Sequence, residues 1–188
     1  MPQSVYTKIL DLLTELSREG APQDLFQFAD AIHNKQIESF VIWRPGADPN
    51  APPVKSYCSV QSIRRLLRFA AELGLIEIGA DRQCGLTGYG RNAVQGDNYP
   101  RVLSLHLTMY LKEKAGVSYS EIKDAITAIR RPEVAFFDTI YEKLRSEREL
   151  KIGEERLHTV LYLLERCGML ASLTKKIYFA PEVQPWAA

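Results

Sequence analysis

Apolar residues recur at the spacing of an α-helix along most of the chain. In residues 4–19 they form one stripe, with Ser4 suited to the N-cap and Gly20 to the stop. A later helix is expected to begin at Ser118 or Ser120, because Ser118 and Glu121 have the spacing of a capping box. This helix is expected to end before Pro132. The same periodicity predicts helices over residues 23–33, 59–73, 99–115 and 154–167, and a further helix that has Pro132 near its start and runs through residues 136–144.

Short apolar runs between these segments predict strands over residues 37–43, 75–78, 169–173 and 177–179, the last two joined through residues 174–176. Residues 44–56 contain four prolines, which exclude a helix or a central strand. We expect an exposed loop there, with a hairpin arm or a partner-binding tail as the alternatives. The predicted fold class is mainly α with small β-hairpins.

Two stretches of the chain share one layout, 94 residues apart. IRRLLRFAAELGLIEI spans residues 63–78, and LHTVLYLLERCGMLAS spans residues 157–172. In each, an amphipathic helix ends at a glycine, Gly74 or Gly168, and the chain turns at once into a short apolar strand. The repeat predicts two tandem units, residues 1–97 with the proline-rich insertion at 44–56, and residues 98–188.

The first repeat leads through a turn into LTGYGRNAV, in which Leu86, Thr87, Gly90 and Arg91 form a Leu-Thr-x-x-Gly-Arg pattern. This region resembles the winged helix-turn-helix superfamily, and most closely the repressors of the multidrug-resistance-regulator type. The resemblance covers residues 58–95 by sequence and residues 118–180 by layout only. The second copy lacks the Leu-Thr-x-x-Gly-Arg element, and the proline-rich insertion departs from the compact helix-turn-helix of the family. The resemblance implies tandem winged-helix domains and a role in binding DNA.

In that family the helix before the wing enters the major groove of DNA. At the matching place this chain carries Gln61, Arg64, Arg65 and Arg68, whose spacing puts them on one helical face. Arginine pairs bidentately with guanine and glutamine with adenine, so these residue types suit base readout. Phosphate contacts are expected from the residues flanking the helix and wing, namely Lys55, Arg82 and Arg91. A solvated, arginine-rich helix face is the alternative reading.

Charge differs between the parts of the chain, although the net charge is only +1. Residues 55–115 hold 9 basic and 5 acidic residues, whereas residues 1–54 hold 4 and 7. The helix expected at 154–167 carries Glu154, Glu155 and Glu165, which phosphates would repel. We therefore expect the first unit to contact double-stranded DNA, as in a transcriptional regulator, and the second to bind a protein partner or form a homodimer. A tandem winged-helix subunit that binds only protein is the alternative.

Signals of other classes are missing from the sequence. It has no phosphate-binding loop, no clustered His and Cys with metal-ligand spacing, no secretory signal and no apolar run long enough for a membrane span. The three cysteines are widely separated, which favours reduced thiols in the cytoplasm. We expect no enzyme activity, cofactor, metal or membrane association, although carboxylates gathered from separate elements into a nuclease site stay open as an alternative.

Overall fold

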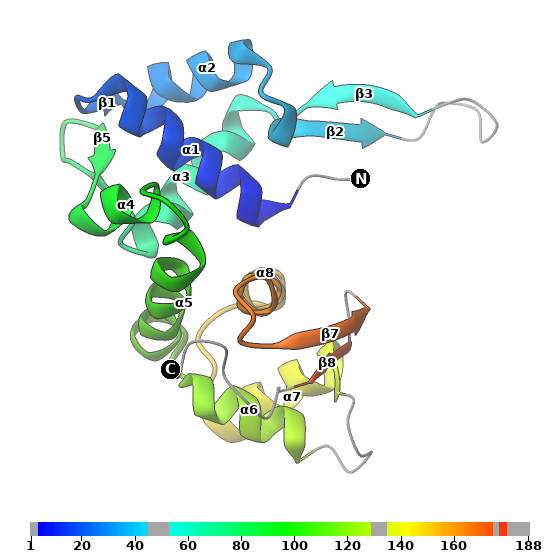
Figure 1. Cartoon of the computed structure of the whole chain (residues 1–188). Helices are drawn as coiled ribbons and strands as arrows, with labels where there is room; N and C mark the ends of the chain where they lie inside the picture. The colour runs from blue at the N-terminus through cyan, green and yellow to red at the C-terminus, as the bar shows by residue number, and fades with distance from the viewer. Residues whose placement is uncertain (1–3, 45–52, 129–134, 175–176, 180–188) are drawn as a thin grey trace. The chain divides into compact units, whose positions relative to one another are not determined.

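The computed structural model describes residues 4–44, 53–128, 135–174 and 177–179 (Figure 1). It is mainly helical with small antiparallel sheets, which confirms the predicted fold class at this level. The chain divides into two compact units, Met1–Tyr99 and Pro100–Ala188, which we call the first and the second unit. The expectations for residues 45–52, Pro132 and the turn at 175–176 lie outside the described residues.

Four helices and a three-stranded sheet form the framework of the first unit. The chain order is α1 (Val5–Glu19), β1 (Gln23–Asp24), α2 (Leu25–Lys35), α3 (Val60–Glu72), β4 (Ile76–Ile78), β5 (Gln83–Leu86) and α4 (Gly88–Ala93), with an insertion between α2 and α3. The sheet is antiparallel, and β5 lies between β1 and β4. The core between helices and sheet is apolar, with Ile9, Leu12, Ile63, Leu67 and Leu75 inaccessible to solvent.

Local signals set most helix ends of the first unit. The Ser4 hydroxyl accepts a hydrogen bond from the Thr7 N–H at 3.2 Å, and Gly20 ends α1 with a left-handed φ of 69°. Both ends were predicted. The helix expected from residue 23 begins instead at Leu25, because Asp24 caps α2 by accepting from two backbone N–H groups. Residues 23 and 24 pair with β5, a partner that local periodicity does not reveal.

The insertion between α2 and α3 is a β-hairpin arm, which was one of the alternatives named for residues 44–56, and the expectation of a loop over the whole of this range was wrong. Its strands β2 (Val41–Arg44) and β3 (Val54–Tyr57) pair antiparallel, with Trp43 opposite Lys55. The strand expected from residue 37 begins only at Val41, because Glu38–Phe40 forms a 3-10 turn that buries Phe40. Figure 1 shows the arm extending away from the helices of the first unit.

The second unit repeats the layout of the first. After α5 (Tyr99–Tyr110) and a short π-helix (Leu111–Ala115), it contains α6 (Tyr119–Thr127), β6 (Ala135–Phe136), α7 (Phe137–Arg148), α8 (Glu154–Arg166), β7 (Ala171–Thr174) and β8 (Ile177–Phe179). The helix expected from near Pro132 begins only at Phe137, because residues 135 and 136 pair with β8. The sheet order β6-β8-β7 corresponds to β1-β5-β4. The two repeated stretches thus become α3 with β4 and α8 with β7, and left-handed Gly74 and Gly168 end the two helices.

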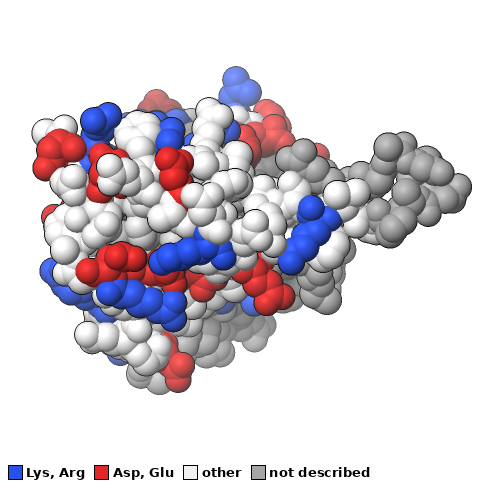
Figure 2. Space-filling model, turned by 90° about the horizontal axis from the view of Figure 1, so that it is seen from above, with Lys and Arg blue, Asp and Glu red and all other residues white. Residues whose placement is uncertain are grey.

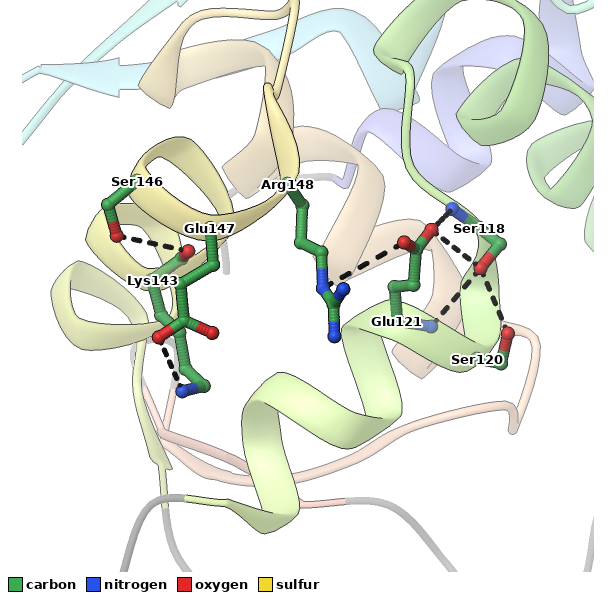
Figure 3. A network of polar contacts seen from close by, with 7 residues as sticks. All are labelled: Ser118, Ser120, Glu121, Lys143, Ser146, Glu147 and Arg148. Carbon is green, nitrogen blue, oxygen red and sulfur yellow. Dashed lines mark hydrogen bonds and ion pairs between the residues drawn. The ribbon is translucent and has the colours of Figure 1, made fainter.

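Polar contacts join two helices of the second unit (Figure 3). The predicted capping box is present: the Ser118 N–H donates to Glu121 at 2.7 Å, and the Glu121 N–H donates to the Ser118 hydroxyl at 3.2 Å. Arg148, at the end of α7, forms an ion pair of 3.8 Å with the same carboxylate. These contacts lower the pKa of Glu121, with the backbone N–H of Ser118 as the largest cause. The start of α6 is therefore tied to the end of α7.

A buried carboxylate joins α1 to α2 in the first unit. Glu15 accepts a hydrogen bond from Lys35 at 2.7 Å and also pairs with Arg18, and only 9% of its side chain is exposed. The hydrogen bond from Lys35 is the main cause that lowers the pKa of Glu15 from its ordinary 4.5. Because the folded pKa lies below the unfolded one, this stabilisation is present at neutral pH and is lost as the pH falls through the folded value.

We expect Glu15→Gln to lower the free energy of unfolding by about 1–2 kcal/mol at neutral pH, since the variant loses charged hydrogen bonds at a buried site. The matched control is Glu19→Gln, which removes the same charge from an exposed position on the same helix, 3.5 Å from Lys35. It is expected to cost at most about 0.5 kcal/mol. Urea unfolding measures both, and the deficit of Glu15→Gln should shrink as the pH falls below 4.5. A deficit that does not depend on pH would contradict the role given to this carboxylate.

Candidate nucleic-acid interface

One side of α3 faces solvent and carries the residues expected to contact DNA. Burial of Ile63, Leu67 and Ala70 fixes the inner side of the helix. On the opposite side of the helix, exposed residues recur about once per helical turn. We call them the outward stripe, which consists of Gln61, Arg65, Arg68 and Glu72. Among the ion pairs that the described residues form, none includes Arg65 or Arg68. Both guanidinium groups are therefore available to a ligand.

Arg64 does not lie on the outward stripe, although the sequence placed it on the same face. Its guanidinium carbon lies 4.1 Å from the centre of the Phe26 ring, and one of its nitrogens lies 3.7 Å from Asp30. Only 29% of the side chain is exposed. The reason is helical geometry, because the residue before Arg65 is turned about 100° toward α2. Arg64 therefore connects α3 to α2, and its charge is partly neutralised.

Arg82 lies near Arg64, in the turn between β4 and β5. It is an exposed residue with a left-handed φ of 66°, and its guanidinium carbon is 5.2 Å from the Phe26 ring. Its carbonyl accepts a hydrogen bond from the Leu25 N–H at 3.0 Å, which ties this turn to the start of α2. The structure thus gathers Arg64 and Arg82 at one aromatic ring, an arrangement that the sequence could not reveal because Phe26, Arg64 and Arg82 are far apart along the chain.

Asp24 supplies negative charge to the same place. Its carboxylate accepts hydrogen bonds from the N–H groups of Gln27 and Phe26, and the first of these is the largest cause that lowers the pKa of Asp24. The charges of Arg82 and Arg64 lower the pKa further. With the carboxylates of Asp24 and Asp30 beside them, these two arginines offer less positive charge to a phosphate than Arg65 and Arg68 do.

The Leu-Thr-x-x-Gly-Arg pattern has a structural explanation in this chain. Leu86 is buried at the end of β5, and the Thr87 hydroxyl donates to the Gly74 carbonyl at 2.8 Å and accepts from the Gly90 N–H at 3.0 Å. A Cβ at Gly90 would lie only 2.0 Å from the carbonyl oxygen of Leu75. The Arg91 guanidinium donates to the Leu86 carbonyl at 3.0 Å. The pattern therefore holds α4 against the base of the β4–β5 hairpin, and Arg91 uses a donor for this purpose.

Lys55, the remaining predicted contact residue, lies on the hairpin arm. It is exposed on β3, and its ammonium group lies 5.5 Å from the centre of the Tyr57 ring. The chain passes from the end of β3 through Cys58 and Ser59 into α3. The arm and the outward stripe are therefore consecutive in the chain.

The equivalent helix of the second unit has different chemistry. At the 94-residue offset, Glu155, Thr159 and Tyr162 stand where the first unit has Gln61, Arg65 and Arg68. A hollow near the start of α8 is lined by three carboxylates, from Asp138, Glu154 and Glu155, together with Phe137, His158 and Thr159. The His158 ring meets the Phe137 ring edge to face at 5.0 Å. This acidic surface would repel phosphates.

Charge over a wider surface is mixed. Figure 2 shows Lys and Arg side chains interspersed with Asp, Glu and uncharged residues among the described residues of the face it draws. On this face the described residues form no broad basic surface.

Other kinds of site find little support in the described part of the chain. It contains no group of three or more His, Cys, Asp or Glu residues placed to hold a metal ion. All three cysteines are buried, and burial raises the pKa of the Cys167 thiol to about 12 and also raises that of Cys84. No helix within the described ranges has both the length and the apolar character needed to cross a membrane.

Comparison with known proteins gives no assignment, since no protein-family model, no curated protein and no solved structure matches this chain. The case for a function therefore depends on the layout of the two units and the chemistry of α3.

Proposed function

We propose that the chain is a DNA-binding protein, used as a transcriptional regulator, that consists of two winged-helix units. Both units have the order helix, strand, helix, helix, strand, strand, with the last strand in the middle of the sheet. This order supports the winged-helix interpretation for each. The β4–β5 hairpin of the first unit is its wing, with Arg82 in the turn.

The observation that carries the proposal is the outward stripe. It presents Gln61, Arg65 and Arg68 to solvent, and no described acidic residue pairs with the two arginines. A helix of this kind fits the major groove, where arginine and glutamine side chains pair with base edges and phosphates. Glu72, at the far end of the stripe, favours docking through the N-terminal part of α3, because a carboxylate near phosphates is repelled.

A second candidate is a protein-interaction subunit without DNA readout. It is favoured by the acidic hollow at α8 and by a net charge of only +1. Our leading proposal combines the two: the first unit binds DNA, and the second unit binds a protein partner or another copy of the chain.

The test is binding of the full chain to a fluorescently labelled, mixed-sequence duplex, followed by anisotropy at rising salt. We expect binding at low salt with a logarithmic salt slope of about −2 to −4, since each neutralised phosphate contributes about −0.9. No binding at low salt by a chain whose circular dichroism shows it to be folded would overturn the proposal and favour the protein-interaction subunit.

A further inference from the structure

The hairpin arm carries exposed side chains that the framework of the first unit does not use. Trp43 is 49% exposed and lies opposite Lys55, and Tyr57 lies two residues further along β3 toward α3. Because side chains alternate along a strand, these three residues share one face of the ribbon, which we call the arm face. Val54, 58% exposed, lies on the opposite face.

We propose that the arm face is a second DNA-contacting surface, which binds the sugar–phosphate backbone beside the groove that α3 enters. This inference rests on the proposed function and extends it, because it assigns Trp43 a contact role and widens the footprint beyond the outward stripe.

Hydrogen bonds attach the base of the arm beside α3. The Cys58 N–H donates to the Phe40 carbonyl at 2.9 Å, and the Cys58 carbonyl contacts the His33 ring nitrogen at 2.8 Å. Cys58 itself is buried, and Ser59 caps α3 by accepting from the Ser62 N–H. The base of the arm and the first turn of α3 are thus held at one point. A DNA duplex that meets Gln61 on that turn also comes near the arm.

The length of the arm places the arm face at the edge of the groove. Trp43 and Lys55 lie two register positions beyond the Val41–Tyr57 pair at the base of the arm, a distance of about 7 Å along the ribbon. B-DNA has a major groove about 12 Å wide and 8.5 Å deep. If α3 enters the major groove, Trp43 and Lys55, about 7 Å further out along the arm, would lie at the sugar–phosphate backbone that borders the groove.

The side chains of the arm face suit a sugar–phosphate backbone. Neither strand of the arm contains an acidic residue, and no described carboxylate pairs with Lys55. Lysine contacts phosphate as a point charge. The indole of Trp43 offers an N–H donor and a flat apolar surface suited to a deoxyribose. A purely apolar partner would leave the Lys55 charge without compensation, so duplex DNA fits the arm face better than an apolar protein surface.

The experiment uses the full chain with Trp186→Phe, which leaves Trp43 as its only tryptophan. We expect the emission of Trp43 to change when a mixed-sequence duplex is added. In the same background, Trp43→Ala with Lys55→Ala should weaken binding about five- to tenfold and reduce the magnitude of the salt slope by about 1, the share of one phosphate contact. The matched control is Val54→Ala, which truncates an exposed side chain on the other face of the arm and should bind as the parent does.

The outcomes separate this inference from the proposed function. If the duplex binds but Trp43 emission does not change, and the double variant binds as Val54→Ala does, the arm inference is overturned and the DNA-binding proposal stands. If Trp43 emission changes with protein concentration alone and not with DNA, the arm is instead an interface between copies of the chain. If the parent chain does not bind DNA, both proposals fall. Circular dichroism of each variant checks that it is folded.

Discussion

Gly90→Ala is expected to lower the free energy of unfolding of the first unit by about 2–4 kcal/mol. A Cβ at this position would lie 2.0 Å from the Leu75 carbonyl oxygen and 3.2 Å from Leu86. The carbonyl cannot easily move away, because it accepts from the Thr87 N–H at 3.2 Å and from the Thr87 hydroxyl at 3.1 Å. Relief of the clash therefore requires α4 to separate from the base of the hairpin.

The matched control for this substitution is Gly88→Ala in the same short helix. A Cβ there would meet no atom within 4 Å. Gly88→Ala is expected to leave stability unchanged or to raise it by about 0.5 kcal/mol, since alanine loses less backbone entropy on folding than glycine does. Thermal and urea unfolding compare the two variants, and a difference in melting temperature of about 10 °C or more is expected. Equal stabilities would show that the contact of α4 with Leu75 is not as described.

The second large effect is expected on DNA binding. Arg65→Ala with Arg68→Ala should weaken binding to duplex DNA about 100-fold at physiological salt, because two contacts to bases or phosphates are lost together. The magnitude of the salt slope should fall by about 2. Both arginines are exposed and lie outside the ion pairs of the described residues, so their removal leaves the packing of α3 intact.

A control with the same loss of charge separates a local contact from a general effect. Arg101 and Arg145 are exposed residues of the second unit, and their double alanine variant has the same net charge as the α3 variant. It is expected to bind DNA within about twofold of the unmodified chain. Equal losses in the two variants would mean that net charge, and not α3, governs binding. Unchanged binding by the α3 variant would remove this helix from the interface.

Features that depend only on residues close together in the sequence could be predicted. The cap at Ser4, the stop at Gly20 and the capping box of Ser118 and Glu121 all depend on neighbours at most four residues away. The repeated helix and strand were also predicted, because they appear twice with one spacing. The winged-helix interpretation and the DNA-binding role stay predictions.

Features that depend on distant partners could not be settled from the sequence, which left the hairpin arm as only one alternative for residues 44–56. The short strand β1 exists because it pairs with β5, and β3 is a strand because it pairs with β2 across the proline-rich segment. At the candidate site, residue types were identified but their surroundings were not. Arg64 has the same spacing signal as Arg65, yet its place on the helix turns it toward α2, where it meets Asp30 and Phe26 instead of joining the outward stripe.

The difference between α3 and α8 bears on stoichiometry. Thr159 and Tyr162 stand in the second unit where the first unit has Arg65 and Arg68. If the first unit binds DNA through α3 as proposed, each polypeptide would therefore make this contact once and would be monovalent toward a duplex. A palindromic operator would then need two polypeptides, and its occupancy would rise sigmoidally with protein concentration if their second units associate. An asymmetric operator would be filled by one polypeptide and would saturate hyperbolically.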